Sequence, residues 1–166
     1  MAVASFDLND ACLAVFHAGN LLGAETGYAS FHDGKLLFGL EAWQSSRIRP
    51  LQTQRRYWRD LSDVPLARAF GPCATSADIV RLHLQRLWNM VPTGSEAAVF
   101  AVPPYWSPVQ LGLLLGIASD VGIPVSGLVD SAVAACRRPC EGAELWHLEP
   151  TLHDLWLTRT DGGDAA

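Results

Sequence analysis

Two apolar runs joined by a clearly marked helix constrain the fold of this chain more than any other sequence feature. Residues 97–102 carry no polar side chain, and residues 124–129 form a second, largely apolar run. Between them, Ser107, Pro108 and Gln110 occupy the cap, first and third positions of a helix, which is a capping box with proline at the helix start. A strand, a crossover helix and a second strand predict two parallel neighbours in one sheet, the first buried on both faces.

The helix after Ser107 is expected to pack one stripe of side chains against that sheet: Leu111, Leu114, Leu115 and Ala118. Gly112 and Gly116 lie four positions apart, which predicts a close approach of the helix backbone to the sheet. Gly122 is a helix-ending signal.

The upstream part of the chain begins with strand-like segments, predicted at 5–8, 11–16, 28–31 and 35–39. A helix is then predicted from Thr75 or Ser76, with Asp78 in its first turn. Its inner side is expected to carry Ile79, Leu82, Leu87 and Met90. A short helix is predicted at 131–136.

This order of elements predicts an α/β lobe of the ribonuclease H-like kind, a mixed sheet with helices on both faces. We assign residues 1–142 to this lobe, with a peripheral helix-and-loop excursion at 41–72. Five arginines lie between Arg47 and Arg59 in that excursion, either as a solvated face with aromatic packing or as an anion-binding or partner surface. Residues 143–166 are interpreted as the start of a second lobe or as a closing hairpin.

The composition narrows the class of protein. The chain has 166 residues, 49% of them hydrophobic, and a net charge of -5, so a buried core is expected and no basic field for nucleic acid exists. No apolar run is long enough to span a membrane, and the N-terminus lacks a basic signal-peptide start, so we expect a cytoplasmic protein. No metal-ligand spacing is seen. Cys12 and Cys73 are expected as buried small hydrophobes, and Cys136 and Cys140 as the same or as a redox pair.

One stretch of the chain resembles a known family. Residues 101–110 read Ala-Val-Pro-Pro-Tyr-Trp-Ser-Pro-Val-Gln, and they are followed by Gly-Ile-Pro-Val at 122–125 and an acidic, alanine-rich segment at 130–135. This pattern resembles the ATPase domain of the 70-kilodalton heat-shock chaperones, in the actin-like ATPase superfamily. The resemblance covers most of residues 5–160 and is specific between 99 and 135. It implies the ribonuclease H-like first lobe of the actin-like ATPase fold.

The phosphate loops of that family are altered in this chain. The family's first loop reads Asp-Leu-Gly-Thr-Thr, whereas this chain has Asp-Leu-Asn-Asp-Ala at 7–11, which places the Asp10 carboxylate where a polyanion would lie. The family's glycine-rich second loop corresponds to residues 148–152, where Pro150 removes a backbone donor and Glu149 adds a negative charge. The family's lysine near the γ-phosphate has no counterpart, because the only lysine is Lys35.

The candidate nucleotide and magnesium site therefore consists of Asp7, Asn9, Asp10 and Asp130, as a vestige of the family's site. Asp7 and Asp130 could help to hold a hydrated magnesium ion. Alternatively, Asp7 ends a strand and Asp130 caps the helix beginning at Ser131. We expect no catalytic residue and no cofactor, with Mg-ATP as the alternative.

Three functions fit these observations. The first is a degenerate actin-like or chaperone-like lobe that binds a protein partner without efficient ATP hydrolysis. The partner would bind at the 47–59 stretch or at the closing hairpin, and the hairpin could also pair two copies of the chain in a homodimer. The second is the nucleotide-binding lobe of a divergent Mg-ATP-dependent ATPase. The third and weakest is a ribonuclease H-like nuclease, which would need Asp7, Asp10 and Asp130 gathered around two metals.

Overall fold

The main sheet has five strands in the order β10-β9-β1-β2-β3. The computed structural model describes residues 3–135 and 145–160. The strands are β1 (Val3–Asn9), β2 (Cys12–His17), β3 (Asn20–Glu25), β9 (Ala97–Val102) and β10 (Val125–Asp130). β1 is antiparallel to β2 and parallel to β9, and β9 is parallel to β10, which confirms the mixed sheet. Within this sheet the order is third-second-first-fourth-fifth, that of a ribonuclease H-like lobe. β3 is a strand that the sequence analysis did not predict.

The register of the strands brings two candidate residues to one edge of the sheet. Asp7 on β1 lies opposite Ala101 on β9, and Asp130 on β10 lies opposite Val102. Because β1, β9 and β10 are parallel, both aspartates stand at carboxyl ends, where ligand sites of such sheets form. The turn after β1 and the start of α4 (Ser131–Ala135) lie at this same edge.

Two long helices cover one face of the sheet. α2 (Ser76–Trp88) begins with Thr75 and Asp78 in a reciprocal capping box, and α3 (Pro108–Val121) begins with the predicted box of Ser107 and Gln110. The core between these helices and the sheet contains Phe6 and Phe100, whose rings meet edge to face at 5.2 Å. Capping and apolar patterning were sufficient to place both helices.

The other face of the sheet is less covered than predicted. The side chains of β9 alternate between buried and half-buried, so β9 is not fully buried on both faces. The short helix α4 packs on this side, against β9 and β10.

The inner stripe of α3 differs from the prediction by one position. Ile117 is buried, whereas Leu115 is 40% exposed. Gly112 and Gly116 have no atom within 4 Å of a Cβ added to either, so they do not provide a close approach to the sheet. Gly122 ends the helix in the left-handed conformation, as predicted. Cys73 is buried but Cys12 is exposed, so the prediction for Cys12 was wrong.

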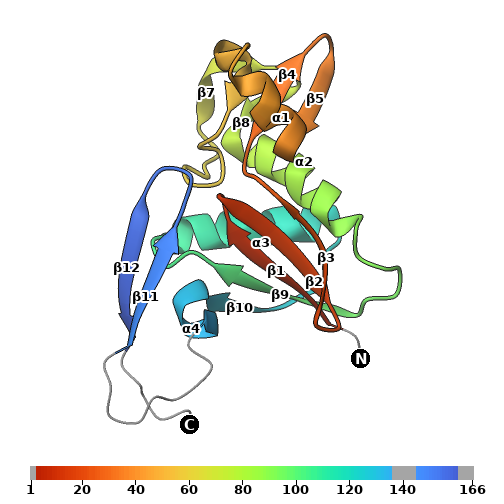
Figure 1. Ribbon diagram of the computed structural model, residues 1–166. Helices are drawn as coiled ribbons and strands as arrows, with labels where there is room; N and C mark the ends of the chain where they lie inside the picture. Colours follow the sequence, from red (N-terminus) through yellow and green to blue (C-terminus); the bar gives the residue numbers. More distant parts are fainter. Residues whose placement is uncertain (1–2, 136–144, 161–166) are drawn as a thin grey trace.

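A small peripheral unit stands above the main sheet (Figure 1). Its elements are β4 (Ala29–His32), β5 (Lys35–Phe38), α1 (Gly39–Ser46), η1 (Pro50–Gln52), β6 (Thr53–Gln54), β7 (Pro65–Phe70) and β8 (Cys73–Thr75). Asp33 and Gly34 both have positive φ, so a tight hairpin turn joins β4 to β5. The predicted excursion thus contains short strands as well as a helix.

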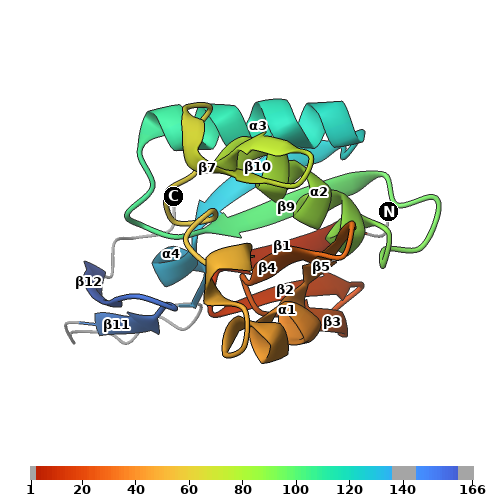
Figure 2. The ribbon, with the colours of Figure 1, turned by 90° about the horizontal axis from the view of Figure 1, so that it is seen from above.

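The last two strands, β11 (Leu145–Pro150) and β12 (Leu155–Thr160), form a separate antiparallel hairpin. Figures 1 and 2 place it beside α4, at the end of the sheet where β1 finishes. Trp146 and Leu157 are 53% and 59% exposed, and with Leu148 and Leu155 they make an apolar outer face. Trp156 is half-buried, and its ring stacks on that of Tyr105 with the ring centroids 4.7 Å apart.

Some predictions fall outside the described residues. The pair Cys136 and Cys140 and the proposed boundary at 142 lie there. None of the helices in the described ranges is long and apolar enough to cross a membrane.

Candidate functional site

The turn after β1 makes direct hydrogen bonds with the tip of the β11–β12 hairpin. We call the whole contact between this hairpin and the rest of the lobe the seam. Asn9 Nδ2 donates to Glu149 Oε1 at 3.1 Å and to the carbonyl oxygen of Pro150 at 3.0 Å. The backbone N–H of Leu152 donates to Asp10 Oδ1 at 2.9 Å. The two segments that the chaperone resemblance aligns with phosphate loops therefore bind each other.

Glu149 is the most enclosed acidic side chain of the hairpin, with only 4% of the residue exposed. Ser131 Oγ donates to its Oε2 at 2.7 Å, and His147 Nε2 lies 3.8 Å from the same oxygen. Burial raises the pKa of Glu149, and the hydrogen bond from Ser131 offsets this only in part. Neutral donors thus hold a carboxyl group in a poorly hydrated place.

Asp10 is even more buried, at 1% exposure, and Gly27 holds its turn in place. The backbone N–H of Gly27 donates to the carbonyl oxygen of Asp10 at 2.7 Å, and a Cβ on Gly27 would lie 2.7 Å from that oxygen. Burial raises the pKa of Asp10, and the Leu152 N–H counteracts this in part. Its Oδ2 has no hydrogen-bond partner in the described part of the chain.

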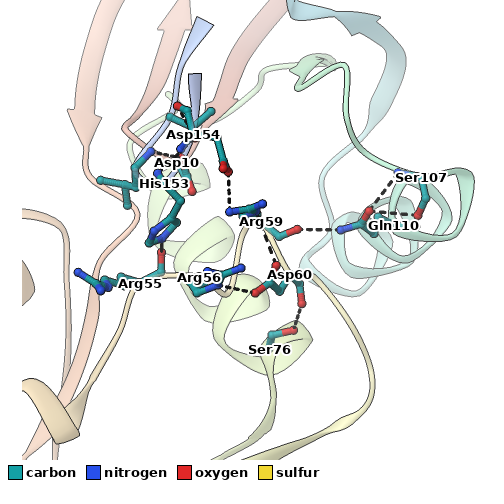
Figure 3. Close-up of polar contacts among 12 residues, drawn as sticks. Asp10, Arg55, Arg56, Arg59, Asp60, Ser76, Ser107, Gln110, His153 and Asp154 are labelled. Carbon is teal, nitrogen blue, oxygen red and sulfur yellow. Dashed lines mark hydrogen bonds and ion pairs between the residues drawn. The ribbon is translucent and has the colours of Figure 1, made fainter. Parts of the chain in front are cut away.

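The hairpin tip also contacts the arginine-rich stretch (Figure 3). Arg59 pairs with Asp154, and His153 Nε2 lies 2.9 Å from the carbonyl oxygen of Arg55, to which it donates. Gln110 at the start of α3 donates to the carbonyl oxygen of Arg59 at 2.9 Å, so the helix cap also positions this arginine.

Three arginines of the stretch have internal carboxylate partners. Arg49 pairs with Asp33 and Arg56 with Asp60, in addition to the Arg59 pair with Asp154. This pairing favours the structural interpretation of the stretch over an anion-binding surface.

A cavity of about 430 Å³ lies between the less covered face of the sheet, α4 and β11. Asp7, Ser131, His147 and Glu149 line it together with apolar side chains such as Val99. Burial raises the pKa of Asp7, against a weaker opposing effect of the Asn9 backbone N–H. The polar part of this cavity contains two carboxyl groups, which disfavours a polyanionic ligand.

The four predicted site residues do not form one cluster. Asp7 and Asn9 line the cavity, whereas Asp10 binds the hairpin backbone. Asp130 Oδ1 accepts from the backbone N–H of Ala132 at 2.8 Å, which is the helix-capping alternative. Within residues 3–135 and 145–160, no group of three or more His, Cys, Asp or Glu side chains is placed so that it could hold a metal ion.

Sequence reasoning missed several residues of the seam. Ser131, His147 and Asp154 were not selected. Arg59 was noted only as one of five arginines in the 47–59 stretch, and Glu149 only as a misplaced charge. Arg59 and Asp154 are 95 positions apart, and no local pattern links them. Only Ser131 carried a signal, because it follows Asp130 at the start of a predicted helix.

Together, the sheet order and the helices define a ribonuclease H-like lobe of the actin-like ATPase fold. Among solved structures, MreB5 of Spiroplasma citri, bound to ADP, is similar to this chain with a TM-score of 0.73 at 13% sequence identity. The match covers 98% of this chain and 49% of that one, so this chain spans about half the length of that structure. No family model and no curated protein matches the sequence. At this identity the similarity concerns the fold alone.

Proposed function

We propose that this chain is a degenerate lobe of the actin-like ATPase fold that acts as a binding or scaffold module without efficient ATP hydrolysis. The observation that carries the proposal is the seam itself. Asn9 and Asp10, the residues at the altered first phosphate loop, already bind Glu149, Pro150 and Leu152. A nucleotide in the family's manner would have to break these hydrogen bonds.

Electrostatics support the same proposal. Asp7, Asp10 and Glu149 place three carboxyl groups near the end of β1, and each has a pKa raised mainly by burial. A phosphate about 5 Å from one ionised carboxylate would meet a repulsion of about 3 kcal/mol at an effective dielectric of about 20. Arg59, the nearest arginine at the seam, is paired with Asp154.

The experiment is a calorimetric titration with Mg-ATP and Mg-ADP, on this chain and on the longest natural protein that contains it. We expect no binding heat from either form. Micromolar binding would overturn the proposal and would favour the divergent ATPase.

One observation favours that second function. Asp7 on β1 and Asp130 on β10 stand at the carboxyl ends of two parallel strands on either side of β9, and a cavity lies beside Asp7. A hydrated magnesium ion in contact with these side chains through water would need Asp7. If the divergent ATPase is correct, Asp7→Ala should lose Mg-ATP affinity in the longer protein, whereas Asp63→Ala, on the exposed loop before β7, should not.

The partner surface of the module is, on this proposal, the outer face of the hairpin. Trp146, Leu148, Leu155 and Leu157 are all exposed there. Among the described residues the hairpin forms a sheet of only two strands, which is marginally stable in water. A second copy of the chain is the first partner to test. Sedimentation over a concentration series should detect association that Leu157→Lys abolishes and the peripheral substitution Ile48→Lys does not. A monomer at all concentrations would exclude the homodimer and leave a different protein as partner.

A further inference from the structure

The carboxyl group of Glu149 is surrounded like a bound ligand. Three side chains from three elements reach it: Asn9 from β1 at 3.1 Å, Ser131 from α4 at 2.7 Å, and His147 from β11 at 3.8 Å. Glu149 itself belongs to the hairpin, whereas Asn9 and Ser131 belong to the lobe. The two hydrogen bonds therefore join the hairpin to the lobe. Asn9 lies 140 positions from Glu149 in the sequence, and Ser131 lies 18 positions from it.

We propose that Asn9 and Ser131 form a carboxyl-binding site of the lobe, and that Glu149 fills this site as an internal ligand that holds the hairpin closed. The inference concerns the same seam as the proposed function but does not depend on it, because a carboxyl group can fill the site whether or not the longer protein binds nucleotide.

The chemistry of the site selects carboxyl groups over phosphates. Its two close donors are a neutral amide and a neutral hydroxyl, which match the two oxygens of one carboxyl group. Asp7, which lines the same cavity, repels additional negative charge on any occupant. A doubly charged phosphate would gain no arginine or lysine partner among the residues that line this cavity.

The geometry also explains why the hairpin would respond to the loss of Glu149. Ser131 Oγ and Asn9 Nδ2 would both lose an acceptor in a place with little access to water. Other contacts across the seam include the hydrogen bonds of Pro150, Leu152 and His153, the Arg59 pair and the Tyr105–Trp156 stack. The hairpin should then open more often without unfolding the lobe.

The experiment removes the internal ligand and supplies an external one. Hydrogen exchange, read by mass spectrometry on peptides from 145–160, is compared between the wild type and Glu149→Ala, with and without sodium acetate, against sodium chloride at equal ionic strength. We expect Glu149→Ala to speed exchange of the hairpin about tenfold or more. Acetate should slow it again by at least threefold, and sodium phosphate at equal ionic strength should not.

Three variants make the test specific. Asp154→Ala also removes a hairpin carboxylate that crosses the seam, but it leaves Glu149 in place, so acetate should not slow its exchange. The double variant Glu149→Ala, Ser131→Ala should lose the acetate effect, because one of the two donors is gone. Glu149→Gln keeps an acceptor for Asn9, and should stay within about threefold of the wild type with no response to acetate.

Two results would overturn the proposal. If Glu149→Ala exchanges as slowly as the wild type, Glu149 does not hold the hairpin. If it exchanges fast but acetate has no effect beyond that of chloride, the site is a packing contact and not a carboxyl-binding site. If Glu149→Ala does not fold, Ser131→Ala in the wild-type background provides the same comparison, and unchanged exchange there contradicts the proposal. None of these results depends on whether the protein binds nucleotide, so this proposal and the proposed function can fail independently.

Discussion

Two regions of this molecule enclose most of a glutamate side chain, 12% exposed for Glu25 and 5% for Glu149, and they stabilise it in different ways. Near α2, Glu25 accepts hydrogen bonds from Arg86 Nε at 2.9 Å and lies 3.0 Å from His83 Nε2. At the seam, Glu149 is held by Asn9 and Ser131, which are neutral. Burial alone would raise the pKa of both carboxyl groups, but His83 and Arg86 outweigh burial and lower that of Glu25, whereas that of Glu149 stays raised.

The histidine of the first region is completely buried and its proton is assigned by its neighbours. Trp58 Nε1 can only donate, and it points to His83 Nδ1 at 3.2 Å, so Nδ1 accepts and Nε2 carries the proton toward Glu25. Tyr57 Oη lies 2.7 Å from the same Nδ1, and Phe38 stacks on the ring at 4.5 Å. Burial lowers the pKa of His83, and Glu25 only partly opposes this.

The difference teaches that a charged partner, rather than the depth of burial, decides whether a buried carboxylate supports the fold. The Glu25 cluster joins β3, α2 and the 57–58 segment with satisfied partners, and it should behave as fixed core. The seam depends on neutral donors, and it should behave as a contact that can open.

The largest expected effect is on the core cluster. His83→Ala removes a fully buried ring and leaves Trp58 and Tyr57 without their acceptor, so we expect a loss of about 3–5 kcal/mol in the free energy of unfolding. Urea denaturation followed by tryptophan fluorescence measures it. The control His32→Ala, at the end of β4, removes a ring that is 20% exposed, so it should cost about 1 kcal/mol or less. A loss below about 1 kcal/mol for His83→Ala would contradict the view of this cluster as core.

The next prediction distinguishes the two glutamates by how a glutamine substitution changes the free energy of unfolding, and by how that change depends on pH. The folded-state pKa of Glu25 is lowered, so its contribution is present above the ordinary value of 4.5 and is lost as pH falls through the lowered value. Glu25→Gln should therefore cost about 2–3 kcal/mol at pH 7, and the cost should shrink toward acid.

Glu149→Gln should behave oppositely. Because its folded-state pKa is raised, ionised Glu149 is disfavoured by folding above that value, and the wild type gains stability as pH falls and the group takes up its proton. At pH 7 the glutamine variant should be as stable as the wild type or slightly more so, and any advantage should vanish near pH 4. Urea titrations at pH 4, 5.5 and 7 test both variants, and equal signs at pH 7 would refute the comparison.

A smaller effect concerns the turn that presents Asp10. A Cβ on Gly27 would lie 2.7 Å from a backbone oxygen, so Gly27→Ala should cost about 1–3 kcal/mol. Its matched control is Gly112→Ala in α3, where nothing lies within 4 Å and alanine should stabilise the helix by about 0.5–1 kcal/mol. Thermal unfolding would measure both changes, and a neutral Gly27→Ala would mean that the turn adjusts freely.

The smallest effect should come from the ion pair at the seam. Arg59 and Asp154 are partly exposed, so a double-mutant cycle with Arg59→Ala and Asp154→Ala should give a coupling of about 1 kcal/mol or less. The coupling should fall further in 0.5 M sodium chloride. A coupling of about 3 kcal/mol would make this pair as important as the Glu25 cluster and would end the distinction between the two regions.

Local sequence signals accounted for most of the fold. Ser107, Pro108 and Gln110 located the start of α3, and Thr75 with Asp78 located that of α2, because capping is a matter of residues three positions apart. The apolar run at 97–102 located β9 without error in its bounds. The weaker signal of β3 was missed, since Asn20–Glu25 is a mostly exposed edge strand with little alternation.

Local sequence signals predicted only part of the candidate site. Asp7, Asn9 and Asp10 were chosen from a loop that resembles a family motif, and they do lie at the end of β1. Their partners depend on where the last hairpin docks, and no local pattern encodes that. The predictions for Leu115, Gly112 and Gly116 in α3 were wrong for a related reason. A helix sequence gives the width of its apolar face better than the angle at which that face meets the sheet.

The sequence by itself thus determined most of the elements of the main sheet and its helices, their order and the class of fold, because caps, turns and apolar periodicity act over a few residues. Only the tertiary structure decided that Asn9 meets Glu149, that His83 meets Glu25 and that Arg59 meets Asp154. Those contacts join segments 58 to 140 positions apart. The strength and sign of each depend on burial and on the charge of the partner, which exist only once the chain is folded.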